Sequence, residues 1–184
     1  MSGGESAPKG KNVRRTAIIK FAALGLFLGL ASAETKGDQL GASDMQARAA
    51  GQWVWQSGLN GVNEAGRYGT KGIPAAANNP GARSEAVSWT DEQGNLWLFG
   101  GYGYSASGSG FLNDLWKWDG ANWTWISGSS TQDQPGVYGA KGVLAVGTAP
   151  GARRSAVSWK DPYGHLWLFG GYGYSASGLG WLND

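Results

Sequence analysis

The sequence contains no cysteine and a single histidine, and only 15% of its 184 residues are charged. Without cysteine the chain can form neither a disulfide nor a thiolate metal site. Zinc and copper sites use several His or Cys ligands, so His165 alone does not indicate one. Its counterpart in an internal repeat is Asn95, within a predicted turn, which favours a solvated turn residue. We therefore expect no metal, no cofactor and no catalytic residue, and a protein that is not an enzyme.

The sequence also lacks a basic surface once its N-terminal segment is set aside. The formal charge is +2, but residues 1–33 hold five of the 15 basic residues and only one acid. The remaining chain has 10 basic and 12 acidic residues, a net charge of −2. Nucleic-acid binding depends on clustered Lys and Arg, so we expect no nucleic-acid partner.

Residues 1–33 have the features of an export signal. A basic stretch precedes ten apolar residues at 21–30, and Ala31-Ser32-Ala33 follows as a small-x-small cleavage pattern. The apolar run is far shorter than the roughly 20 residues of a membrane span. We predict cleavage after Ala33, a periplasmic or extracellular location and no stable membrane span afterwards; the alternative is an uncleaved anchor. Arg14-Arg15 leaves the twin-arginine route open beside the general one. Residues 34–52 are polar and are expected to form a flexible lead-in.

Glycine and tryptophan, by contrast, are abundant, with 33 and 11 residues. This combination is typical of all-β proteins with short strands and many turns. Residues 53–114 recur at 123–184 with a constant offset of 70, and 37 of the 62 aligned positions are identical. A fixed period of this kind indicates repeated supersecondary units that stack on one another.

Within one unit the patterns predict four antiparallel strands. Leu96 to Phe99 is continuously apolar, so this strand is expected to be covered on both faces. Gly100-Gly101 closes it, and the copies Gly170 and Gly171 do the same, permitting a bend. Tight turns are predicted after the first and third strands, and long loops after the second and fourth. The predicted strands are 84–89, 96–99, 115–118 and 123–126, and the long loops are 102–114 and 127–150.

At these residues the chain resembles the kelch-repeat β-propeller family, including exported kelch-repeat proteins and the central-domain type of galactose oxidase. The resemblance rests on Gly100-Gly101 before a long loop and on the tryptophans of the third and fourth strands. Trp118 and Trp125 keep the six-residue kelch spacing, whereas Trp123 would shorten the hairpin, and both alternatives stay open. The resemblance implies a propeller of four-stranded blades. The copper chemistry of galactose oxidase uses Cys and several His, which this chain lacks.

The resemblance also implies how the chain is divided. Residues 53–184 would be kelch repeats, with an N-terminal closing strand at 53–57, a complete blade at 81–126 and a partial blade at 151–184. A propeller needs 4–8 blades, so we expect an incomplete propeller from a fragment. Open strand edges favour self-association.

Ligand-binding candidates follow from the expected one-sided arrangement of the long loops. Loop tyrosines suit partner contact, and arginines at the start of each first strand could grip an anionic or sugar ligand or form structural ion pairs. Asp114 and its copy Asp184 are expected to cap turns. We expect a binding or scaffold module for a protein or cell-surface partner through the long-loop face. The alternatives are a lectin-like module and an oxidase whose site lies in missing blades. The candidates are Tyr102, Tyr104, Tyr172, Tyr174, Arg83 and Arg153.

Overall fold

The computed structural model describes residues 53–184, so the predictions for 1–33 and 34–52 lie outside the described residues. Every strand of the described residues belongs to one compact unit, Ser57–Asp184. The described part contains ten β-strands and no helix, and all named strands pair antiparallel. The expected all-β class is therefore confirmed. No helix in this part is long and apolar enough to cross a membrane.

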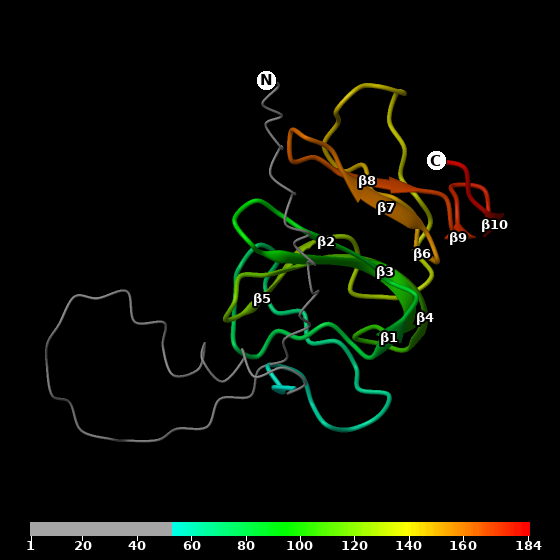
Figure 1. Ribbon diagram of the computed structural model, residues 1–184. Helices are drawn as coiled ribbons and strands as arrows, with labels where there is room; N and C mark the ends of the chain where they lie inside the picture. The colour runs from blue at the N-terminus through cyan, green and yellow to red at the C-terminus, as the bar shows by residue number, and fades with distance from the viewer. Residues whose placement is uncertain (1–52) are drawn as a thin grey trace, which may run out of the picture. The chain divides into compact units, whose positions relative to one another are not determined.

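The first repeat forms one sheet in which strands that are consecutive in the sequence lie side by side (Figure 1). Its first strand is divided into two short pieces that both pair with β3, and β4 and β5 follow as successive neighbours. The break between the two pieces lies at Glu85, where φ is 55°. The strands are β1 (Arg83–Ser84), β2 (Val87–Thr90), β3 (Leu96–Tyr104), β4 (Ser109–Trp118) and β5 (Trp123–Ser127).

The prediction of a long loop at 102–114 is wrong. Strand β3 continues to Tyr104 and β4 begins at Ser109, so the two form one long hairpin with a short turn between them. Tyr102 pairs with Phe111 across the hairpin. The glycines and serines that indicated a loop are small residues in a strand that closely approaches its neighbours.

Gly100 and Gly101 lie at a register shift within this hairpin. Their φ angles are 64° and 99°, and those of Gly170 and Gly171 are 71° and 94°. A Cβ added at Gly101 would lie 2.5 Å from the carbonyl oxygen of Ser84. Only glycine combines positive φ with so close an approach, so the pair bends the strand.

The second repeat reproduces these strands in two smaller sheets. β6, β9 and β10 form one sheet, and β7 pairs with β8 in the other. The registers match, because Val157 faces Phe169 as Val87 faces Phe99. The strands are β6 (Arg153–Arg154), β7 (Val157–Lys160), β8 (Leu166–Phe169), β9 (Tyr172–Tyr174) and β10 (Leu179–Trp181).

The core lies where the two repeats meet, with β7 beside β2 (Figure 1). Val87, Trp89 and Phe99 are buried there, and Leu166 and Leu168 of the second repeat pack against them. The indole Nε1 of Trp89 donates a hydrogen bond of 3.2 Å to the Trp159 carbonyl. The expectation that 96–99 is covered on both faces is wrong, because only Phe99 is buried.

The same positions of the second repeat are much more exposed. Trp89 is 9% exposed, whereas its counterpart Trp159 is 48% exposed. Val157 and Phe169 show the same difference from Val87 and Phe99. The second repeat therefore covers the first, and its own corresponding face is turned to water.

The strands can be set beside the remaining expected boundaries. Residues 53–57 hold no named strand, and the sheet of the first repeat spans 83–127, one residue beyond the end of the expected 81–126 blade. Between β5 and β6 the crossover contains only one bridge, Val137 with Ala149, which matches the bridge of Arg67 with Asn79.

Candidate binding surface

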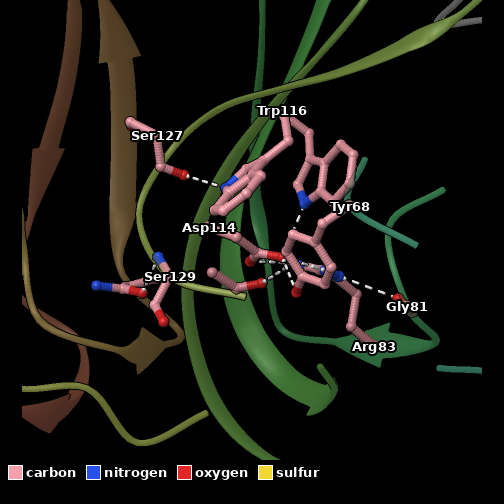
Figure 2. Close-up of polar contacts among 10 residues, drawn as sticks. Tyr68, Gly81, Arg83, Asp114, Trp116, Ser127 and Ser129 are labelled. Atoms are coloured by element: carbon pink, nitrogen blue, oxygen red, sulfur yellow. Dashed lines mark hydrogen bonds and ion pairs between the residues drawn. The ribbon is translucent and has the colours of Figure 1, made fainter. Parts of the chain in front are cut away.

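A buried cluster of polar groups connects three parts of the first repeat. Figure 2 shows the side chains of Tyr68, Arg83 and Trp116 converging on Asp114. The guanidinium of Arg83 donates from Nη1 and Nη2 to the two carboxylate oxygens, at 2.6 and 2.8 Å. The Tyr68 hydroxyl and the Trp116 indole each donate to Oδ2 at 2.7 Å. This arrangement of Tyr68, Arg83, Asp114 and Trp116 is called the latch below.

The latch stabilises the fold because each of its buried charges has a partner. Arg83 also donates from Nε to the Gly81 carbonyl at 3.1 Å and from Nη1 to the Gly100 carbonyl at 3.1 Å. Asp114 is fully buried. A buried ion pair is tolerated when hydrogen bonds satisfy its remaining atoms, and losing one partner is strongly destabilising.

The ionisation of the latch is fixed by its surroundings. Burial raises the pKa of Tyr68 far above its usual range, and the negative charge of Asp114 adds to this. Burial alone would lower the pKa of Arg83, but hydrogen bonding and attraction to Asp114 raise it overall. The phenol therefore stays protonated and the guanidinium charged at neutral pH.

The second repeat carries the counterparts of Tyr68, Arg83 and Asp114 at Tyr138, Arg153 and Asp184, and we call these three residues the second latch. Arg153 donates from Nη1 and Nη2 to the Asp184 carboxylate, both at 2.7 Å, and Tyr138 donates to it at 2.6 Å. The hydrogen bond from Arg153, with that from Tyr138, lowers the pKa of Asp184. Asp184 is partly exposed, unlike Asp114.

These contacts place the arginine candidates within the framework. Arg83 and Arg153 are buried, and Nε, Nη1 and Nη2 of each donate to the latch or to carbonyls, as the structural alternative requires. The turn-capping role expected for Asp114 is wrong, because it lies inside β4 and binds Arg83. Tyr68 was missed, although its repetition as Tyr138 at the same offset was a usable signal.

The tyrosine candidates lie in strands and pack against other rings. Tyr102 meets Phe111 edge-on at 5.3 Å, and Tyr172 meets Trp181 in the same way at 5.1 Å. Phe111 also contacts Tyr172 and Tyr174 of the second repeat, at 5.8 and 5.9 Å. An aromatic row therefore runs across both repeats and ends at Trp181, which is 84% exposed. Tyr104, the counterpart of Tyr174, is half-buried at the end of β3.

The tryptophans of the third and fourth strands form a second group in the first repeat. Trp118 is buried and faces Trp123, with ring centroids 5.4 Å apart. Trp125 contacts the ring of Tyr68 edge-on at 5.1 Å, and Lys71 lies 4.3 Å from its centroid. These side chains pack the outer strands against the preceding crossover.

The crossover also covers the hairpin of the first repeat. Asp133 accepts from the Phe111 amide at 2.9 Å and donates its own amide to the Phe111 carbonyl at 2.8 Å. The Gln132 side chain accepts hydrogen bonds from Ser105 and Ser107 at 2.8 and 3.1 Å. Residues 129–133 thus form a cover over the β3–β4 hairpin, and we call them the cover segment.

The corresponding part of the second repeat forms a groove of about 510 Å³. Tyr138 of the crossover lines it together with the hairpin residues 175–184. The separate β7–β8 sheet of the same repeat carries Trp159 and Trp167, whose rings stack 6.1 Å apart at an interplanar angle of 2°. The candidate binding surface consists of this groove and the exposed rings of the second repeat.

His165 lies elsewhere, in the turn between β7 and β8. Its Nδ1 is 2.7 Å from Asp161, which also accepts from the Trp167 indole at 3.0 Å. These hydrogen bonds lower the pKa of Asp161 against the opposing effect of desolvation. The first repeat has the same turn with Asn95 and Asp91. The turn is thus a repeated structural element.

Among residues 53–184, no three His, Cys, Asp or Glu side chains are grouped as metal ligands would be. Comparison with known proteins found no matching family model, curated protein or solved structure. Arguments about function therefore depend on the surface itself.

Proposed function

We propose that this chain is an exported module of the kelch propeller type that binds or scaffolds a protein partner through its long-loop face. The observation that carries the proposal is the groove lined by Tyr138 and residues 175–184, which includes the highly exposed ring of Trp181. The groove lies between the crossover and the end of the β9–β10 hairpin, which stands in place of one of the two expected long loops. Contiguous exposed apolar surface on a soluble protein marks an interaction site.

Rigidity supports the same function. The two latches hold each hairpin to its first strand through an ion pair, buried in the first repeat and partly exposed in the second, so the rings are presented on a fixed framework. Large rings have few rotatable bonds and lose little conformational entropy when a partner covers them. Binding surfaces carried by rigid scaffolds use this advantage.

Carbohydrate binding is a second candidate, and Trp181 favours it. This highly exposed indole lies beside Asn183 and Asp184 in the groove. A sugar could stack on the indole and accept or donate hydrogen bonds at the amide and carboxylate. The two candidates differ in the ligand that Trp181 would touch.

Site-specific photocrosslinking separates them. A benzoylphenylalanine at position 181 retains an aromatic ring, and the same residue at the exposed turn position Tyr163 serves as control. We expect a discrete protein adduct from position 181 and none from 163 in the producing cell. Binding of the purified partner should then be saturable and lost in Trp181→Ala. Saturable binding to a glycan array with no protein adduct would instead establish the carbohydrate function.

A further inference from the structure

The contact between the two repeats serves as a template for a contact between two chains. Within one chain, the cover segment and the tyrosines of β9 bury the first-repeat hairpin. The second-repeat hairpin retains the chemistry that this contact uses, because Ser175, Gly180 and Asn183 match Ser105, Gly110 and Asn113. Trp181 replaces Phe111 with a larger ring. The receiving half of the contact is therefore present a second time, and in the described residues it is exposed.

The backbone of the covering half is also present twice. Residues 59–63 hold in the first repeat the position that 129–133 hold in the second, although none of the five residues is identical. Asn63 and Asp133 both have φ of 60°, so the backbone adopts the same turn at both places. Val62, which corresponds to Gln132, is 87% exposed. Residues 59–63 therefore have the shape of a cover segment and an exposed side chain at its centre.

Gly58 and Gly128 occupy matching positions in the two repeats but differ in what lies against them. A Cβ at Gly128 would be 2.0 Å from the Asn113 carbonyl oxygen, because the chain there runs against β4. At the matching Gly58 the nearest atom among residues 53–184 is the Asn79 Oδ1, 3.9 Å away. Both glycines have positive φ, 79° and 90°. Gly58 thus retains the backbone of a close approach without the strand that it would approach.

The aromatic row points to the same docking. Phe111 packs on Tyr172 and Tyr174 of the following repeat. By the same offset, Trp181 would pack on Tyr102 and Tyr104, and Tyr102 is 44% exposed. Trp181 at one end of the row and Tyr102 at the other are thus both exposed, and they match as a pair between two copies.

We propose that the second repeat of one copy binds the first repeat of another copy, head to tail. In this complex residues 59–63 cover the groove at 175–184, and Trp181 lies on Tyr102 and Tyr104. The inference rests on the proposed protein-binding function and names a second copy of this chain as the partner. The interface is heterologous, so it generates closed rings or extended chains of copies.

The contact between copies would be less polar than the contact within one chain. Arg154 pairs with Glu85 between the repeats at 2.8 Å, and the Ser155 hydroxyl also donates to Glu85. The equivalent positions across the interface are Ser84 and Ser155, which form no ion pair. The interface between copies therefore depends on rings and on the cover segment, and salt should not disrupt it.

Light scattering on the full chain, purified after any processing by the cell, tests the proposal with three variants. Gly180→Leu should abolish association. A Cβ at Gly180 meets no atom within 4 Å in the single chain, whereas at Gly110 it would lie 2.7 Å from Asp133. Leu179→Ser is the matched control. The matching residue of the first repeat is Ser109, and it remains exposed although that hairpin is covered. Val62→Gln should strengthen association by restoring the acceptor that Gln132 provides.

The expected parent result is a mass that rises with concentration to multiples of the chain mass. Gly180→Leu should raise the dissociation constant at least about tenfold, and Val62→Gln should lower it roughly two- to tenfold. Circular dichroism must show Gly180→Leu folded like the parent. A monomeric parent, or equal association of all three variants, would overturn the proposal. If position 181 then crosslinked to another protein, the proposed binding function would stand without self-assembly.

Discussion

The first and second repeats share most of their residues but differ in what surrounds them. Val87, Trp89 and Phe99 are buried because the second repeat packs against them. Their counterparts in the second repeat are about half exposed. Burial here is therefore a property of the neighbouring repeat, as expected for units that each cover the next.

Removing the carboxylate of the latch should show the difference most strongly. Asp114→Ala leaves Arg83 charged and buried without a partner, which should cost about 3–5 kcal/mol of unfolding free energy. Asp184→Ala should cost less, about 1–3 kcal/mol, because groove water can reach the vacated position. Urea denaturation of both variants measures the comparison. Equal losses would show that the two latches are equally enclosed.

Truncating the paired tryptophans should give the next largest difference. Trp89→Ala empties a buried ring site and should cost about 3–5 kcal/mol. Trp159→Ala removes a ring already half in water and should cost about 1–2 kcal/mol, measured on dilute protein. Thermal and urea unfolding should agree on this order. A reversed order would mean that the β7–β8 face is covered in solution even when dilute.

Alkaline pH should act on the first latch through Tyr68. Its pKa in the folded state is raised above the ordinary value of 10 by burial and by Asp114. The stability from the protonated phenol is therefore complete below about pH 10. It is lost as the pH rises from there towards the folded pKa. Tyr68→Phe should flatten the fall in stability between pH 9 and 11, relative to the parent, in parallel urea titrations. If stability falls equally with pH in Tyr68→Phe and in the parent, folding does not raise the pKa of Tyr68.

The smallest effect should come from the ion pair between the repeats. Arg154 and Glu85 are both well exposed, so water screens their attraction. Glu85→Gln should lower the midpoint of urea unfolding only slightly, because exposed ion pairs contribute little to stability. Salt up to 0.5 M should remove even that difference. A loss several times larger would indicate that the pair is enclosed when the protein folds.

The sequence was informative where its signal was local or periodic. Alternation and turn residues predicted the antiparallel strands, and Gly100-Gly101 predicted the bend. The extent of the β3–β4 hairpin was not predictable from the same signal, because Gly and Ser are typical of loops and here allow close packing instead. Asp114 lies 31 residues from its partner Arg83 and 46 from Tyr68, and only the repetition of Tyr68 and Asp114 indicated these contacts. The exposed fraction of a side chain depends on the neighbouring repeat, so no local sequence pattern predicts it.

Hydrogen exchange at two protein concentrations tests the central claim most directly, because it reads matched peptides of both repeats in one sample. In dilute protein, amides of β7–β8 should exchange faster than those of β2–β3. At high concentration the β7–β8 amides and the 175–184 hairpin should slow towards the rates of the first repeat. Exchange rates that do not depend on concentration, or that are equal in both repeats when dilute, would contradict the account.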